Sequence, residues 1–279
     1  MDPEIPSLVD APMLNYWGPP TATLDWCEEN YKVTHLIAEF WNTLTNTLFL
    51  ILASVGIYHV RKHKLEPRFI VSYVGMLLVG VGSCLFHTTL QFEMQLMDEL
   101  PMLYATTFAF YSLVEMKGPP RYGAKLFAGL IVYCIVITAL YLASLNPVFH
   151  QVAYGIEMLT ILGRCVHLIR GVPEGPYKQS LIKLVWYSAV TFLAGFFLWN
   201  VDNIFCPQLR SARDYVNFPL EVVLQLHGWW HILTCMGCTG FILLTQALRI
   251  YYLGKHHKYH IRYFKGFVPY LQHCLESKD

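Results

Sequence analysis

The sequence predicts an all-α protein, a bundle of seven transmembrane helices. The chain has 279 residues, of which 55% are hydrophobic and only 14% are charged. Soluble domains carry roughly 25% charged residues, so this composition indicates an integral membrane protein. The second observation is that the sequence contains seven mostly apolar runs. Each is about as long as a membrane-spanning helix, which needs roughly 20 residues.

The breaks between the runs carry helix-terminating residues. Four of them contain Pro, at 62–67, 117–120, 146–147 and 171–176, and Pro marks turns and helix ends. Connections this short suit a single domain. The predicted spans are roughly 35–58, 69–88, 96–115, 124–143, 147–169, 181–203 and 220–250. The membrane domain then covers 35–252, between an N-terminal segment, 1–34, and a C-terminal tail, 253–279.

The distribution of Lys and Arg predicts the orientation of the bundle. With seven spans, 17 of the 20 basic residues fall on one side, and only Lys32, Arg210 and Arg213 fall on the other. By the positive-inside rule, we expect a cytosolic C-terminus and a lumenal N-terminus. Two cysteines that lie outside the apolar runs, Cys27 and Cys206, then share the oxidising side, where disulfides persist. A disulfide between them is plausible, and two unrelated thiols are the alternative.

Ionisable side chains occur where the chain is expected to lie in lipid. Ser83 and His87 are one turn apart in the second span, Asp98 opens the third, and His227 and His231 are four residues apart near the start of the seventh. Residues at this spacing share one helix face. The predicted span directions bring all five groups to the lumenal side at a common depth. Because charge at membrane depth is costly, such groups indicate a functional cavity.

Three imidazoles form the ligand set of a catalytic zinc, which keeps one position for water. We therefore expect a zinc hydrolase within the membrane. Asp98 could accept the proton of water and deliver it to a leaving group, or orient a ligating histidine. Ser83 could donate a hydrogen bond to an oxyanion, or could be a small residue that lets helices pack closely. A seven-helix receptor with structural zinc and a proton-relaying transporter remain alternatives.

Oxygen-bearing side chains gather at the end of the N-terminal segment and at the start of the first predicted span. Asp25, Glu28, Asn30 and Glu39 lie close together in the sequence, and Ca²⁺ is bound by six to eight such oxygens. The spacing is not that of an EF-hand, so a solvated acidic face is the alternative. A buried carboxylate at Glu39 would need a partner, and a metal would supply one.

Several long strings resemble the alkaline ceramidase family, closest to its alkaline ceramidase and phytoceramidase branch, within the seven-helix membrane hydrolases that include the adiponectin receptors. The resemblance covers nearly the whole chain and rests on residues 16–19, 21–30, 37–42, 82–87, 94–102, 147–151, 197–206 and 227–232.

The resemblance implies a ceramidase that cleaves the amide of ceramide or phytoceramide into a sphingoid base and a fatty acid. It implies zinc at His87, His227 and His231, with Ser83 and Asp98 at the reaction centre. Its calcium site corresponds to Asp25, Trp26 (through the carbonyl), Glu28, Asn30 and Glu39, and its disulfide to Cys27 and Cys206. We expect an enzyme of the endoplasmic reticulum or Golgi membrane with a lipid substrate. The sequence indicates neither nucleic acid nor a particular protein partner.

Overall fold

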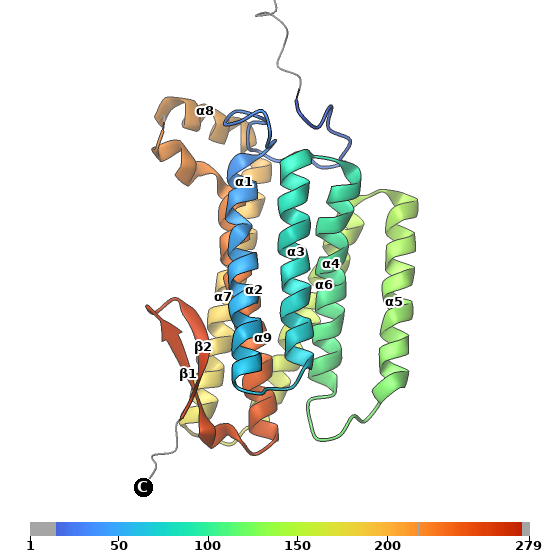
Figure 1. Cartoon of the computed structure of the whole chain (residues 1–279), viewed down its shortest axis with the longest axis vertical. Helices are drawn as coiled ribbons and strands as arrows, with labels where there is room; N and C mark the ends of the chain where they lie inside the picture. The colour runs from blue at the N-terminus through green and yellow to red at the C-terminus, as the bar shows by residue number, and fades with distance from the viewer. Residues whose placement is uncertain (1–14, 217, 275–279) are drawn as a thin grey trace, which may run out of the picture.

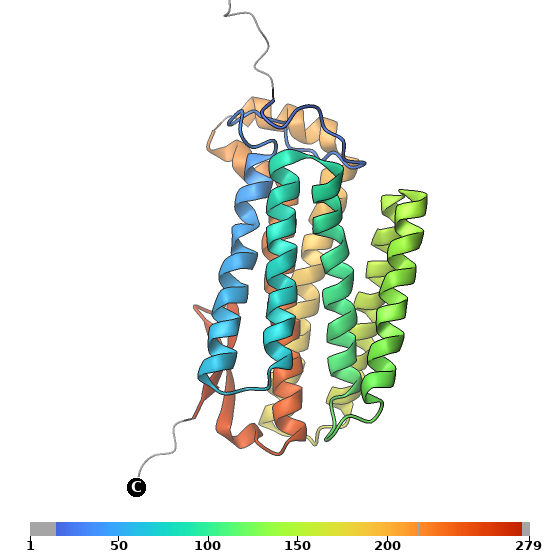
Figure 2. The ribbon, with the colours of Figure 1, turned by 45° about the vertical axis from the view of Figure 1, so that its right-hand side comes forward.

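The computed structural model describes residues 15–216 and 218–274, and most of them are helical. The membrane helices are α1 with α2 (Phe40–Thr45 and Thr47–Lys62), α3 (Arg68–Thr89), α4 (Phe92–Val114), α5 (Gly123–Ser144), α6 (Pro147–Arg170), α7 (Pro176–Ile204) and α9 (Leu226–Tyr252). They form one bundle of long helices (Figures 1 and 2). The predicted fold class is therefore confirmed.

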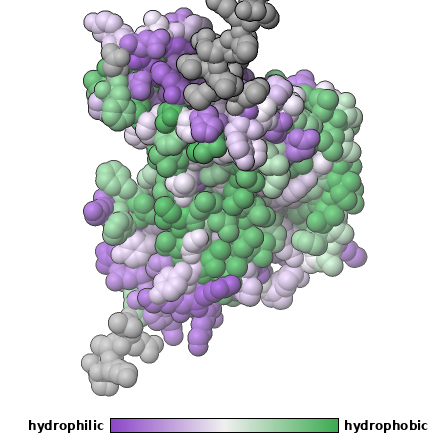
Figure 3. Space-filling view, turned by 45° about the horizontal axis from the view of Figure 1, so that its top comes forward, coloured by the Kyte–Doolittle hydropathy of each residue, from purple (hydrophilic) through white to green (hydrophobic). Residues whose placement is uncertain are grey.

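Six of these helices, with α1 and α2 counted as one, are long and apolar enough to cross a membrane. The seventh is α4, which has 23 residues and packs extensively against α3. Its early turns carry Glu93, Asp98 and Glu99, which lower its hydropathy. Between the polar ends of the bundle, the space-filling view shows a broad apolar surface (Figure 3).

Several predicted boundaries were wrong by a few residues. The first helix begins at Phe40, because the backbone N–H groups of Ala38 and Glu39 donate to carbonyls at the end of α3. The last run starts with a separate 3-10 turn, Leu220–Leu224, before α9 begins at Leu226. Because α4 begins at Phe92, Asp98 lies in its second turn and not at its start.

The two ends of the bundle differ. At one end, here called the disulfide end, the N-terminal segment packs beside the short helix α8 (Cys206–Val216) (Figures 1 and 2). The loops that follow α2, α4 and α6 lie at the other end, here called the basic end. The tail, for which the sequence predicted no element, begins there with a 3-10 turn, His256–Lys258. It continues as a β-hairpin of β1 (Tyr259–Phe264) and β2 (Val268–His273).

Candidate metal centre

The three histidines meet at the disulfide end of the bundle. His87 comes from the last turn of α3, and His227 and His231 come from the first two turns of α9. One ring nitrogen of each lies within 4.8 Å of the others. All three side chains are buried. Sequence spacing predicted the pair on α9, and the tertiary structure brings His87 to it.

Neighbouring side chains orient two of the rings. The Nδ1 atom of His87 is hydrogen-bonded to the carboxylate of Glu39. The Nδ1 atom of His231 lies 3.0 Å from the hydroxyl of Thr45, whose own proton can go to a backbone carbonyl. Partners of this kind hold Nδ1–H and leave Nε2 free to bind a metal. Sequence reasoning missed both contacts.

In the part of the chain that the structure describes, the imidazole of His227 has an unpaired nitrogen, which tests whether a metal ion fits this site. The Nδ1 atom of His227 is buried and has no hydrogen-bond partner among the described residues. A buried polar atom normally has a partner. Neutral imidazoles with nitrogens this close match the donor set of zinc, so these residues fit such an ion.

Two glycines allow the backbones to approach closely at the site. A Cβ on Gly82 would lie 1.8 Å from the carbonyl oxygen of Met97, so α3 and α4 touch there. This contact brings Ser83 next to Asp98, and the two side chains are hydrogen-bonded. On the other side, a Cβ on Gly228 would lie 3.3 Å from the side chain of Thr45. Both glycines stand directly beside candidate site residues.

The residues predicted to bind calcium, here called the head cluster, are Asp25, Trp26, Glu28, Asn30 and Glu39. The structure brings them together above the histidines. The Glu28 carboxylate accepts the backbone N–H groups of Trp41 and Asn42 at 2.7 and 2.8 Å, and thereby caps α1. Glu39 accepts the Trp26 backbone N–H at 3.3 Å, and Asn30 donates to Asp25 at 3.2 Å.

The electrostatics of the head cluster favour a cation. Burial raises the pKa of Glu28 to about 8, and the nearby Glu39 carboxylate adds to the rise. Burial also raises the pKa of Glu39 to about 8, with Asp25 contributing. The amide oxygen of Asn30 is buried without a hydrogen-bond partner among the described residues. Carboxylates and an unpaired amide oxygen are ligand types that Ca²⁺ takes, but both Glu28 oxygens already accept backbone N–H groups in this arrangement.

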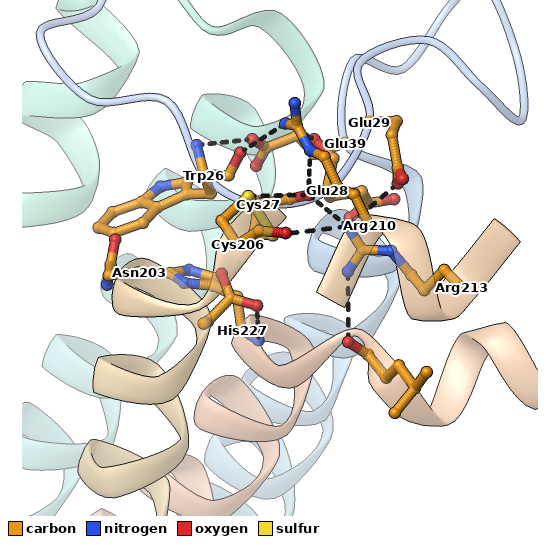
Figure 4. The surroundings of a disulfide bond; sticks show 12 residues. Trp26, Cys27, Glu28, Glu29, Glu39, Asn203, Cys206, Arg210, Arg213 and His227 are labelled. Carbon is orange, nitrogen blue, oxygen red and sulfur yellow. Dashed lines mark hydrogen bonds and ion pairs between the residues drawn. A yellow bond between two sulfur atoms is a disulfide. The ribbon is translucent and has the colours of Figure 1, made fainter. Parts of the chain in front are cut away.

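A disulfide holds the head cluster against the histidines. Cys27 and Cys206 are joined, with their Cα atoms 5.3 Å apart. The ring of Trp26 lies over that of His227, with centroids 4.3 Å apart (Figure 4). Arg213 of α8, which is fully buried, donates to the Cys27 carbonyl at 2.6 Å. The head cluster therefore contacts the histidines twice, through Glu39 and through Trp26.

Further residues at the site carried no clear signal in the sequence. Asp202 of α7 accepts the backbone N–H of His227 at 3.3 Å. Asn46 lies 3.2 Å from Nδ1 of His231. Glu99, beside Asp98, is buried and accepts hydrogen bonds from Tyr141 and Gln95. A polar residue within an apolar run was the available indication for each of them, but it could not say which partner the side chain would meet.

Comparison with known proteins identifies the family. The model of the ceramidase family matches residues 18–272. The chain belongs to this family. It is 41% identical to alkaline ceramidase 3 of Mus musculus over 256 residues, covering 91% of this chain and 93% of that protein. It is 39% identical to alkaline ceramidase YPC1 of Saccharomyces cerevisiae over 249 residues, covering 84% and 78% of the two chains.

Membership of the ceramidase family confirms the expectation of an amidohydrolase. A plant relative, the alkaline ceramidase of Arabidopsis thaliana, is 28% identical over 261 residues, which are 92% of this chain and 95% of that protein. The residues that the family model matches, 18–272, include the positions of the three histidines, the head cluster and both disulfide cysteines.

Proposed function

We propose that this ceramidase is zinc-dependent and hydrolyses the amide of ceramide or phytoceramide, releasing a sphingoid base and a free fatty acid. The observation that carries the proposal is the convergence of His87, His227 and His231 with their ring nitrogens within 4.8 Å. Those three side chains would hold the ion. When bound, zinc supplies a Lewis acid and lowers the pKa of water toward about 7.

We assign Asp98 the role of the general acid–base group. Its hydrogen-bond partner is the Ser83 hydroxyl, one helical turn before His87 on α3. Asp98 would accept the proton that water loses as the new C–O bond forms at the amide carbon. It would then return that proton to the amide nitrogen as the C–N bond breaks, so that protons balance over the cycle. Before water attacks, the Ser83 hydroxyl would donate to this carboxylate and orient it. Once Asp98 has taken up the proton, the hydroxyl would be free to donate to the developing oxyanion.

Calcium at the head cluster is the second part of the proposal. Asp25, Glu28, Asn30, Glu39 and the carbonyl of Trp26 would hold it. A cation there would keep Glu39 ionised, and the same carboxylate orients His87. The ion would therefore stabilise the disulfide end and, through Glu39, the ring of one zinc ligand.

The distribution of charge supports a membrane orientation. The basic end carries most of the Lys and Arg residues, so we place it in the cytosol and the disulfide end in the lumen of the endoplasmic reticulum or Golgi. Ceramide dissolved in the bilayer would reach the site laterally, with its two chains among apolar side chains.

The test uses the purified full-length protein in detergent. Metal content and release of fatty acid are measured together with ceramide, dihydroceramide and phytoceramide as substrates. Bound zinc together with turnover of one or more of these substrates supports the proposal. Ceramide binding without turnover would support a receptor instead, and turnover by a protein stripped of zinc would remove the metal from the mechanism.

A further inference from the structure

The C-terminal β-hairpin docks on the flank of the bundle. Its strands pair antiparallel, with Phe264 opposite Val268 next to the turn. Three residues, 265–267, connect the last paired positions, and the Phe267 backbone N–H donates to the Phe264 carbonyl at 3.0 Å. Within this turn Lys265 and Gly266 have left-handed φ angles of 47° and 82°, which tight hairpin turns use. An isolated two-stranded hairpin is marginal in water, so it depends on what it packs against. Tyr259 and Leu271 on its inner face are buried in the core formed with α7 and α9.

The hairpin points along the bundle toward the level of the membrane. At its base, the rings of Tyr259 and His273 lie 6.4 and 6.0 Å from that of His63, the residue that follows α2. Near its tip, the ring of Tyr263 lies 5.8 Å from that of Tyr187. Tyr187 is well inside α7, about 16 Å from the start of that helix at 1.5 Å per residue. Figure 1 shows the same course, with the strands rising beside α7.

The outer face of the hairpin has a gradient from polar side chains near the base to exposed aromatic rings at the tip, where Lys265 is the charged exception. Near the base, His260 pairs with Gln272, and both residues are exposed. At the tip, Phe264 and Phe267 are 63% and 68% exposed. Two rings this exposed on one turn form an apolar patch that a free hairpin in water would be expected to bury. The direction of the gradient matches the path from water into a bilayer.

The neighbouring surface has the composition of a membrane interface. Trp186 on α7, next to Tyr187, is 65% exposed, and Tyr58 near the end of α2 is 58% exposed. Trp and Tyr concentrate at the level of lipid headgroups. Arg262 and Lys265 on the hairpin are exposed as well. Long basic side chains near apolar surface extend their charge toward the headgroups, where anionic lipids attract them.

We propose that this hairpin is an interfacial anchor whose binding partner is the phospholipid of the leaflet at the basic end. Phe264 and Phe267 enter the boundary between headgroups and acyl chains, and Arg262 and Lys265 contact lipid phosphates. The strands have open edges, which the hydrocarbon core does not tolerate, so the tip lies in the interface and not deeper. This role is independent of the chemistry at the histidines.

The test maps lipid contact along the hairpin. Full-length protein in which photoreactive benzoyl-phenylalanine replaces Phe267 is reconstituted in phosphatidylcholine nanodiscs and irradiated. Lipid adducts are then measured by intact-protein mass spectrometry. The matched control carries the same probe at His260, which is exposed on the outer face near the base and leaves the hydrogen bond from Arg262 to Gln272 intact. We expect several-fold more lipid adduct at 267 than at 260, with equal melting temperatures. Equal adduct at the two positions would overturn the proposal, as would a probe at 267 that captures protein instead of lipid in native membranes.

A second arm tests the phosphate contacts. Adding phosphatidylserine should raise the adduct at 267 in the protein with native Arg262 and Lys265. The same addition should have no effect on R262Q/K265Q carrying the same probe. If phosphatidylserine changes the amount of lipid adduct in neither protein, the proposed contact of Arg262 and Lys265 with lipid phosphates is wrong. If it changes both equally, the attraction comes from elsewhere on the basic end.

Discussion

Helices α9 and α5 have opposite surroundings. In α9, 72% of the most apolar window is buried inside the protein, whereas in α5 the corresponding share is 6%. Yet α5 is the more hydrophobic helix, with a window hydropathy of 2.5 against 1.4. Lipid tails are as apolar as Leu, so no hydrophobic force drives apolar side chains inward. For these two helices, the more apolar one is the less buried, so apolarity alone does not indicate burial inside the bundle.

The two helices are also held differently. In α9, small residues allow close packing: a Cβ on Gly240 would lie 2.2 Å from the hydroxyl of Ser188 on α7. In α5, Tyr141 is the buried residue, and its hydroxyl is hydrogen-bonded to Glu99 on α4. Two of the three histidines therefore sit on a strongly enclosed helix. Helix α5 contacts α4 through polar groups near its end and through the ring pair of Tyr111 and Phe127 near its start.

The largest effect is expected on α9. His231→Ala should abolish hydrolysis and lower bound zinc, because two remaining imidazoles cannot hold the ion in a tetrahedral site with an open position. His87→Ala and His227→Ala should behave alike. The matched control is Ile135→Ala on α5, whose side chain is 63% exposed and which should keep its zinc and turnover. Zinc analysis and fatty-acid release on the same samples decide it, and full occupancy with normal turnover in a histidine variant would refute the ligand assignment.

The next effect is expected at Asp98. Asp98→Asn should retain zinc and lose about 10²–10⁴-fold in turnover, because an amide cannot accept and return a proton. If the variant has normal activity, Asp98 has only a structural role. If the variant loses zinc, Asp98 is a zinc ligand. The measurements are kcat with ceramide and zinc per polypeptide.

Glu39→Gly tests whether the head cluster supports the enclosed site through calcium. Ca²⁺ that binds only the folded protein raises its stability by mass action. Wild type should therefore melt higher in Ca²⁺ than in chelator, with zinc kept saturated. The variant should lose that difference and most activity, and it should bind zinc about 10–100-fold more weakly because His87 loses the partner of its Nδ1 atom. Identical melting of wild type in both conditions would leave the head cluster as an acidic face without calcium.

The calcium effect should depend on pH. Because the folded-state pKa values of Glu28 and Glu39 are raised to about 8, the folded apo protein binds protons that the unfolded chain releases. Apo stability should therefore fall as pH rises from the ordinary glutamate pKa toward about 8. Calcium needs ionised carboxylates, so its stabilisation should grow over the same range. Thermal melting with and without Ca²⁺ between about pH 6 and pH 9 measures both trends, and a pH-independent increment would contradict the assignment.

The smallest effect is expected on α5. Tyr141→Phe removes the hydroxyl that donates to Glu99 and should destabilise the protein by about 1–3 kcal/mol, because the buried carboxyl loses a partner. Ile135→Ala should change the melting temperature less, because its side chain faces lipid in both states. If Ile135→Ala is the more damaging substitution, α5 is held by apolar packing and the contrast with α9 fails.

The sequence was sufficient for much of the site because its signals are local. The four-residue spacing alone places His227 and His231 on one face of a helix, and it does the same for Ser83 and His87. The polar residues that orient these side chains were harder to predict from the sequence. Glu39 was read as a calcium ligand, and its hydrogen bond to His87 spans 48 positions. No periodicity encodes such a contact, which exists only once α1 and α3 are packed.

The sequence by itself determined the seven-helix architecture. A helix that spans a membrane must be long and mostly apolar, and such runs can be recognised in the sequence alone. Tertiary structure decided where the helices begin. Residues 35–39 are apolar enough to join the first span, yet Ala38 and Glu39 bond to the end of α3 instead. It also decided that the tail forms a hairpin, since two strands this short are stable only against α7 and α9. Local composition fixes whether a segment can enter a membrane, and packing between distant segments fixes which side chains meet there.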